Sequence, residues 1–112
     1  MQETSTGLHY WIYENGEGKQ AQKDQFVSIS YTIRLTDGTL CYEAGDTTPK
    51  QVHIGHGNVE IGLHEALQLM REGDRGKFIF PSHLAFGVSG DSGKIPPSAS
   101  VVYDIHLLTI HP

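Results

Sequence analysis

Histidines are the first residues in this sequence whose type and spacing could do chemistry. The 112-residue chain has seven of them, and the pair His53-x-x-His56 is followed by Glu60 and His64. Imidazole nitrogens and carboxylate oxygens are ligands that Zn²⁺ takes in proteins, at about 2.0–2.2 Å. However, the first two histidines fall at a strand end and a glycine-flanked turn, whereas Glu60 and His64 fall on the solvent side of an expected helix. Because this spacing enforces no convergence, we predict no metal ligands, and histidine-based metal binding is the weakest function left open.

The single cysteine, Cys41, is the second candidate, as a nucleophile paired with a histidine elsewhere in the fold. A lone cysteine beside a strand is more often a small buried hydrophobic residue, and one cysteine excludes an internal disulfide. The sequence has no G-x-S-x-G motif, no P-loop and no G-x-G-x-x-G between a strand and a helix. We therefore predict neither a nucleophilic mechanism nor a cofactor.

Charge and hydrophobicity narrow the classes of partner. The formal net charge is −5, and the eight Lys and Arg residues are scattered, whereas nucleic-acid binding needs a clustered basic face. No apolar stretch approaches the roughly 20 residues that span a bilayer, and the start lacks the pattern of a signal peptide. The polar first residues are compatible with the trimmed start of a longer precursor. We therefore expect a periplasmic protein or one anchored by a removed lipoprotein signal, and a cytoplasmic one as the second choice.

Alternating apolar residues predict a mostly β protein. Residues 27–35 place five apolar side chains on one face at strict period two, which fits a half-buried antiparallel strand, and Asp37-Gly38 follows as a tight hairpin turn. Thirteen glycines, well above the usual share of about 7%, mostly separate such runs. We expect strands over residues 8–13, 27–35, 40–43, 51–54, 76–80 and 101–108.

One segment has helical periodicity instead. Its apolar residues fall on one face of a helix over residues 59–71; they are Val59, Leu63, Ala66, Leu67 and Met70. Asn58 is the expected N-cap, and Gly73 is expected to end the helix. Gly62 costs helix stability relative to alanine, which indicates close backbone packing at that position.

These elements predict the α+β class, with a five- to six-stranded antiparallel sheet wrapped around one short helix. We expect residues 1–6 to form a flexible N-terminal tail and residues 7–112 to form one domain, since the chain is too short for two ordinary cores. An apolar concavity with few polar groups is then the remaining candidate site, a form typical of ligand and peptide pockets.

The order of five motifs resembles the FKBP-type peptidyl-prolyl isomerases. They are Gly7-Leu8-His9-Tyr10 with Gly16-x-Gly18, Val27 to Gly38, Gly55 to Met70, Ala85-Phe86-Gly87, and Ile95-Pro96-Pro97-x-Ala99-x-Val101-Val102-Tyr103-Asp104-Ile105. The resemblance runs from about residue 7 to the end and implies an FKBP-like fold. A weaker likeness is to a lipoprotein branch associated with gliding bacteria. The family resemblance implies an enzyme that isomerises Xaa-Pro bonds.

That reaction suits a chain without acids, bases or nucleophiles in a recognisable constellation. Rotation about a peptide C–N bond faces a barrier of about 18–20 kcal/mol, and uncatalysed Xaa-Pro exchange takes about 10–100 s. The planar amide is the more charge-separated form, so a dry pocket destabilises it relative to the twisted transition state. Hydrogen bonds to the twisted carbonyl add to this effect.

The resemblance also assigns site residues by position. The catalytic residues it implies are Tyr31, Tyr42, Phe86 and Tyr103. The substrate-binding residues it implies are Cys41, Val59, Glu60, Leu63 and Ile95, where Glu60 would donate its backbone N–H to a ligand carbonyl. Val59, Leu63 and Tyr103 would face the core in any fold with these periods, so a purely structural role is the alternative for each.

The sequence departs from the family pattern at five places, with Cys41-Tyr42 counted as one. Cys41-Tyr42 replaces an aromatic–aspartate pair, Leu63 stands where tryptophan is common, and Phe86 lacks a hydroxyl. Glu60 and Lys50 bring charge to positions that are commonly apolar. We therefore expect reduced activity, partly restored by the ring and hydroxyl of Tyr42.

The expected partners are proline-containing client polypeptides, with at most weak binding of macrolides, and the expected state is a monomer. The alternative is a non-catalytic or weakly catalytic proline-peptide-binding or chaperone module.

Overall fold

The alternating segment forms β3 (Phe26–Leu35), which pairs with three other strands. The computed structural model describes residues 1–57, 59–87, 89–91 and 93–111. Val27 and Ile29 are completely buried and Ile33 is nearly so, as the period-two pattern predicts. At the end of the strand Gly38 has a φ of +95°, and its N–H donates to the carbonyl of Leu35 at 2.9 Å. The predicted hairpin turn is therefore confirmed.

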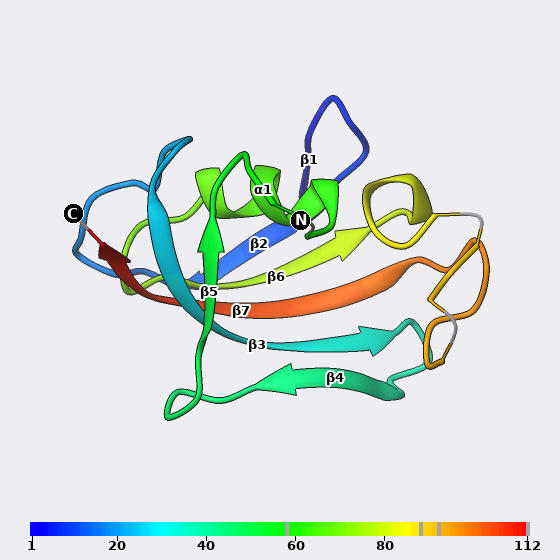
Figure 1. Ribbon diagram of the computed structural model, residues 1–112. Helices are drawn as coiled ribbons and strands as arrows, with labels where there is room; N and C mark the ends of the chain where they lie inside the picture. The colour runs from blue at the N-terminus through cyan, green and yellow to red at the C-terminus, as the bar shows by residue number, and fades with distance from the viewer. Residues whose placement is uncertain (58, 88, 92, 112) are drawn as a thin grey trace.

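The strands form one antiparallel sheet, which confirms the predicted α+β class. Its order is β1-β2-β6-β7-β3-β4, and β5 also pairs with β3. β3 bends strongly, so its first half pairs with β5 and its second half with β4 (Figure 1). The remaining bounds are β1 (Gln2–Glu3), β2 (His9–Glu14), β4 (Leu40–Ala44), β5 (Lys50–His53), β6 (Arg75–Phe80) and β7 (Val101–His111).

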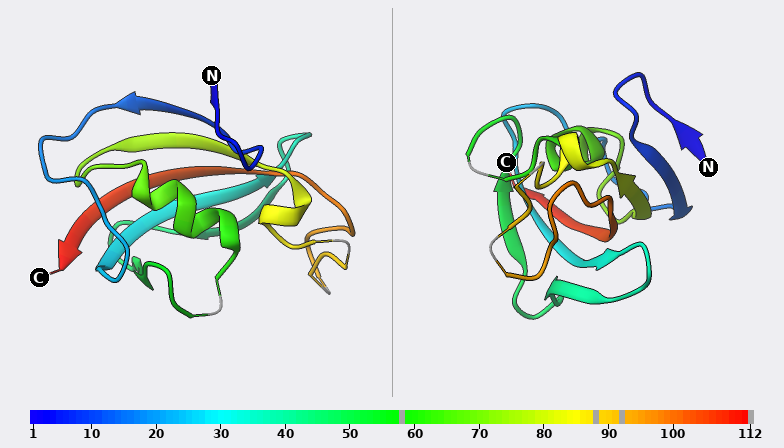
Figure 2. Two further views of the ribbon diagram at one scale, coloured as in Figure 1. Left: turned by 90° about the horizontal axis from the view of Figure 1, so that it is seen from above. Right: turned by 90° about the vertical axis from the view of Figure 1, so that its right-hand side faces the viewer.

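One α-helix, α1 (Ile61–Gln68), lies in the hollow of the curved sheet (Figure 2). A short 3₁₀ helix, η1 (Ser82–Leu84), follows β6. The neighbours of Gly62 leave no room for a side chain, because a Cβ there would lie 2.9 Å from the carbonyl oxygen of Leu84 and 3.1 Å from the ring of Phe80. The predicted close packing at Gly62 is confirmed.

The helix is shorter than the predicted range of residues 59–71. At its start Glu60 has extended backbone angles (φ −58°, ψ 140°) and is the N-cap, while the predicted N-cap, Asn58, lies outside the described residues. At its end the carbonyl of Met70 accepts from the N–H of Ala21 at 3.0 Å, and Arg71 pairs with Gln20. Hydrogen bonds to residues 20 and 21 thus replace the last expected helical turn. The spacing of apolar residues within residues 59–71 cannot predict such a distant contact.

The first residues, predicted to be a flexible tail, contain a short paired strand. Gln2 and Glu3 pair with Tyr10 and His9 as β1, which is the strand beyond the predicted number. The Oγ1 of Thr6 donates to Glu65 of α1 at 2.5 Å, so the segment also contacts the helix. Two exposed polar residues are too few to show the alternation that predicts a strand. This strand forms because β2 offers its edge for pairing.

Two turns pack closely together beside the sheet. The N–H of Gly16 donates to the buried carboxylate of Asp74 at 2.6 Å, and the N–H of Arg71 donates to the other oxygen at 2.8 Å. A Cβ on Gly16 would lie 2.5 Å from the backbone carbonyl carbon of Gly73. The two backbones can therefore approach only because residue 16 has no side chain.

We expect Gly16→Ala to lower the free energy of unfolding by about 1–3 kcal/mol, the usual cost of overpacking. Gly45→Ala is the matched control, because a Cβ at Gly45 would meet nothing within 4 Å. That control should stay within about 1 kcal/mol of the parent protein. Urea unfolding measures both, and equal losses in the two variants would contradict the steric explanation.

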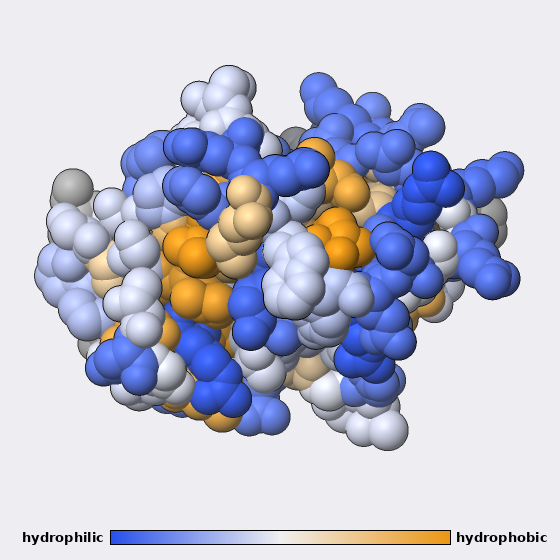
Figure 3. Space-filling model, turned by 180° about the vertical axis from the view of Figure 1, so that it is seen from behind, coloured by the Kyte–Doolittle hydropathy of each residue, from blue (hydrophilic) through white to orange (hydrophobic). Residues whose placement is uncertain are grey.

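The surface opposite to the view of Figure 1 is mostly polar, with apolar side chains in small separate patches (Figure 3). Large aromatic side chains fill the core between sheet and helix, where Phe78, Phe80 and Tyr103 are buried, whereas Trp11 and Phe26 are exposed. Among the described residues, no helix combines the length and apolar character needed to cross a membrane.

Candidate functional site

A cavity of about 400 Å³ opens between the second half of β3, the neighbouring strands, the start of α1 and the segment after η1. We call it the inner-face pocket. Its lining residues are Tyr31, Ile33, Tyr42, Lys50, Val59, Glu60, Ala85 and Phe86. Five of the nine residues predicted from the sequence therefore gather around one opening: Tyr31, Tyr42, Val59, Glu60 and Phe86.

A smaller cavity of about 20 Å³ shares part of this lining and extends toward the core. Leu63 and Tyr103 line it together with Tyr31 and Glu60. Leu63 and Tyr103 are almost completely buried, at 2% and 1% exposed. They therefore line the floor of the pocket and at the same time belong to the core, and a functional role for them stays a prediction.

Aromatic rings form one wall of the pocket. Tyr31 lies near-parallel to Tyr103, with ring centroids 6.3 Å apart, and Tyr103 in turn stacks on Phe80 at 4.4 Å. The wall is thus continuous with the core and rigidly supported. Burial raises the pKa of the Tyr31 hydroxyl, and the neighbouring Glu60 raises it further. This hydroxyl therefore stays protonated at neutral pH and can donate a hydrogen bond.

Glu60 has an unexpected partner at the pocket floor. Its carboxylate accepts a hydrogen bond from the hydroxyl of Tyr103. Burial raises the pKa of that hydroxyl well above its ordinary range, and the Glu60 carboxylate raises it further. The hydroxyl therefore remains a donor, and the charge at residue 60 is satisfied inside the pocket rather than left exposed to a ligand.

Asp91 was not among the residues predicted from the sequence, but it completes the site. Its carboxylate accepts from the hydroxyl of Tyr42, and also from the N–H groups of Gly93 at 3.1 Å and Ile95 at 2.6 Å. These bonds lower the pKa of Asp91, with the Tyr42 hydroxyl as the largest cause. Asp91 is not itself a lining residue, but its carboxylate contacts the pocket through the lining residue Tyr42.

This contact predicts a defined pH dependence. Because the folded-state pKa of Asp91 lies below its ordinary value of 3.8, the carboxylate's contribution to stability is fully present above that pH and is lost as the pH falls through the lower folded-state value. Thermal unfolding of the parent protein and of Asp91→Asn should therefore differ by a constant amount above about pH 4 and converge below it. A difference that persists unchanged in acid would show that the carboxylate is not responsible.

Two predicted binding residues lie behind the pocket lining. Cys41 is 3% exposed and Ile95 is 1% exposed, and neither lines the cavity. The thiol of Cys41 lies 3.7 Å from the carbonyl oxygens of Thr39 and Lys94, so it packs where β4 meets the 87–98 segment. This burial agrees with the interpretation of Cys41 as a small hydrophobic residue. Substrate contact by these two residues stays a prediction.

The side chains of the four residues considered as metal ligands in the sequence do not all come together; these are His53, His56, Glu60 and His64. Glu60 turns to Tyr103, and the Nδ1 of His64 accepts from the N–H of Gly55 at 2.9 Å. Only His53 and His56 lie together, with ring centroids 4.1 Å apart. The four side chains therefore do not share one site, while the absence of metal ligands among them stays a prediction.

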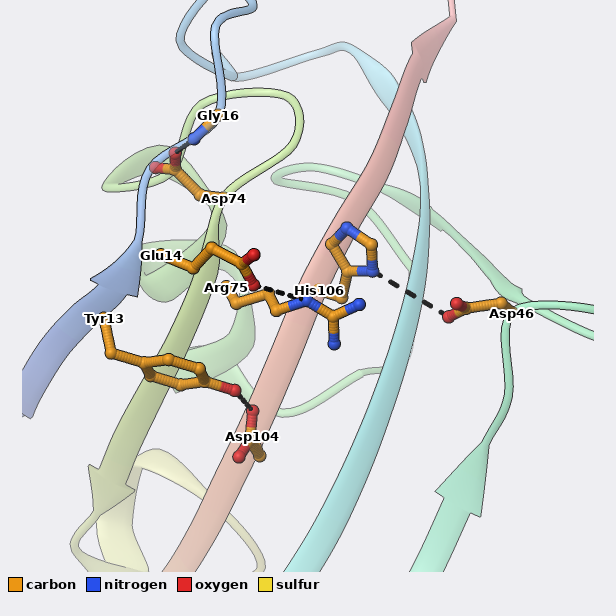
Figure 4. Close-up of polar contacts among 8 residues, drawn as sticks. All are labelled: Tyr13, Glu14, Gly16, Asp46, Asp74, Arg75, Asp104 and His106. Carbon is orange, nitrogen blue, oxygen red and sulfur yellow. Dashed lines mark hydrogen bonds and ion pairs between the residues drawn. The ribbon is translucent and has the colours of Figure 1, made fainter.

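A second large cavity, of about 390 Å³, lies on the outer face of the sheet. Figure 4 shows two polar contacts at this cavity: the lining residue Tyr13 donates to Asp104 at 2.5 Å, and the Nε of Arg75 lies 2.8 Å from Glu14, which is outside the lining. His106 from β7 lies 3.8 Å from Asp46. This cavity has few apolar walls and its charges are of both signs, so the inner-face pocket is the better candidate for an apolar peptide segment.

Comparisons with known proteins point to the same pocket-forming domain. The family model described as FKBP-type peptidyl-prolyl cis-trans isomerase matches residues 17–108. A probable FKBP-type peptidyl-prolyl cis-trans isomerase FkpA of Neisseria meningitidis is 38% identical over 107 residues, which is 96% of this chain and 39% of that protein. An FK506-binding protein of the same species is 32% identical and covers 94% of this chain and 97% of its own length.

A solved structure shows the same fold. The crystal structure of FkpA from Escherichia coli superposes with a TM-score of 0.89 at 29% identity, over 99% of this chain and 51% of that one. The chain thus spans about half or less of the length of these FkpA proteins. The similarity covers only part of each of them.

Proposed function

Because this chain belongs to the FKBP-type peptidyl-prolyl cis-trans isomerase family, we propose that it isomerises Xaa-Pro bonds of client polypeptides in the inner-face pocket. The observation that carries the proposal is the gathering of Tyr31, Tyr42, Phe86 and Val59 around one cavity. An apolar wall from four separate segments is suited to a proline ring, and a cavity of about 400 Å³ has room for it and its neighbours.

The proposed mechanism is solvent exclusion followed by stabilisation of the twisted amide. Proline seated against the ring of Tyr31 loses water, and the charge-separated planar amide loses more solvation than the twisted form does. Two groups can then donate to the carbonyl of the residue before proline or its neighbour. One is the protonated Tyr31 hydroxyl, and the other is the backbone N–H of Glu60 at the helix start. Neither step needs a covalent intermediate.

Tyr42 and Asp91 take part by shaping the pocket entrance. Their hydrogen bond joins β4 to the 87–98 segment, and the ammonium group of Lys94 lies 5.0 Å from the centre of the Tyr42 ring. We propose that this contact does the positioning that a carboxylate at residue 42 would otherwise do. Replacing the aspartate at 91 by alanine should lower kcat/KM roughly 3- to 10-fold, the effect of losing one ordinary hydrogen bond.

A non-catalytic binding module is the second candidate, because Phe86 offers no hydroxyl to a substrate and Lys50 places a charge at the pocket edge. An exchange assay on Xaa-Pro peptides with varied preceding residues separates the two. Acceleration at micromolar protein supports an isomerase. Binding of the same peptides without acceleration would replace that proposal by the binding module. An envelope location stays a prediction.

A further inference from the structure

A second cluster of side chains lies away from the pocket, where the 22–25 turn meets the end of β5. Backbone pairing holds this region: Phe26 pairs with His53, the N–H of Asp24 donates to Ile54 at 2.9 Å, and the N–H of Ile54 donates to Gln25 at 2.9 Å. The N–H of His56 donates to the carbonyl of His53 at 3.0 Å, which closes the next turn. The two segments that carry Asp24 and the two histidines are therefore held by backbone hydrogen bonds before any ligand arrives.

The side chains of these three residues converge. The Nε2 of His56 lies 2.6 Å from the Oδ1 of Asp24, and one donor atom from each residue lies within 4.8 Å of the other two. Two imidazoles and one carboxylate are a donor set that suits Zn²⁺ and related ions, with further positions left for water. Around Zn²⁺ such donor atoms are roughly 3–3.5 Å apart, so small side-chain rotations would suffice.

The surroundings allow those rotations. Asp24 and His56 are exposed and His53 is half-buried. The ring of His53 lies between Phe26, at 4.0 Å, and His56, at 4.1 Å, so its position is restrained. The His56 ring is near-parallel to it, at 19°, and must tilt for both lone pairs to meet one ion. Its exposure leaves space for this movement.

A simple surface ion pair would need only two of these groups. His9 and Glu3 form such a pair at 3.6 Å on the same molecule. At the cluster a third donor, His53 at the end of β5, lies beside this pair. A third donor is not needed for a histidine–aspartate pair.

We propose that Asp24, His53 and His56 form a binding site for one divalent transition-metal ion of the Zn²⁺ type. The ion would join the 22–25 turn to the connection that leads from β5 to Val59 and Glu60, and so would brace one side of the inner-face pocket from outside. The proposal does not depend on isomerase activity, because its test measures binding alone.

Isothermal titration of the full chain with zinc chloride tests the site. We expect one saturable Zn²⁺ per chain and no saturation with Mg²⁺, which prefers oxygen ligands. Asp24→Asn, His53→Gln and His56→Gln should each weaken Zn²⁺ binding roughly 10-fold or more. His9→Gln, the matched control on a paired surface histidine, should bind as the parent chain does.

Thermal unfolding with and without EDTA provides a second readout, and it also shows that each variant folds. A ligand bound only by the native state must raise the midpoint, by on the order of 10 °C at a hundredfold excess over Kd. If His53→Gln does not fold, the exposed Asp24→Asn still decides. Absence of saturable binding by the parent chain, or equal losses in His9→Gln and Asp24→Asn, would overturn the site.

Discussion

Tyr31→Ala is expected to lower kcat/KM for Xaa-Pro exchange roughly 30- to 160-fold, which corresponds to about 2–3 kcal/mol of lost transition-state stabilisation. Tyr31 lines both the inner-face pocket and the small cavity at its floor. Without the ring, water reaches the amide and the hydroxyl donor is lost at the same time. A protease-free exchange assay on Xaa-Pro peptides measures this loss in kcat/KM.

Two variants separate the causes. Tyr31→Phe keeps the wall and removes the donor, so its loss in kcat/KM should be the smaller one. Thr32→Ala changes the next residue on the same strand, which lines the outer-face cavity, as Tyr31 also does, but not the inner-face pocket. It should leave exchange unchanged. If Thr32→Ala slowed exchange as much as Tyr31→Ala, the reaction would belong to the outer face and the proposed pocket would be wrong.

Most of the fold could be predicted because its signals are local. The alternation in residues 27–35 and the Asp37-Gly38 turn specify a strand and its return without any knowledge of partners. The ends of α1 could not be predicted in the same way. Its last expected turn is replaced by hydrogen bonds to residues 20 and 21, and β1 exists only because Tyr10 and His9 offer a strand edge.

The site residues also divide into those that could be predicted from the sequence and those that could not. Positions that line the pocket, such as Tyr31 and Val59, follow from the family resemblance once the strand register is known. Asp91 could not be found that way, because its contact with Tyr42 joins residues 49 apart in the sequence through a segment without periodicity. An acidic residue within a glycine-rich segment was the available signal, and such residues are common in turns for local reasons.

Tyr103→Ala is expected to reduce the free energy of unfolding by about 3–5 kcal/mol, as for other fully buried aromatic residues. Tyr103 is 1% exposed and packs on Phe80 with ring centroids 4.4 Å apart. Tyr103→Phe keeps this packing and removes the donor to Glu60, and should cost about 1–3 kcal/mol. Urea unfolding distinguishes the two, and equal costs would mean that the hydrogen bond contributes everything and the ring nothing.

A double-mutant cycle with Glu60→Ile shows whether the pair acts as a unit. If the Tyr103 hydroxyl serves mainly to satisfy the Glu60 carboxylate, then removing both groups should cost less than the sum of the single changes, by about 0.5–3 kcal/mol. Additive costs would contradict this.

Coupling would also explain why residue 63 is a leucine. Leu63 lines the same small cavity, and the Glu60 carboxylate and the Tyr103 hydroxyl occupy the pocket floor beside it. Leu63→Trp should then be tolerated in the Glu60→Ile, Tyr103→Phe background and overpack the floor, by about 1–3 kcal/mol, in the parent chain.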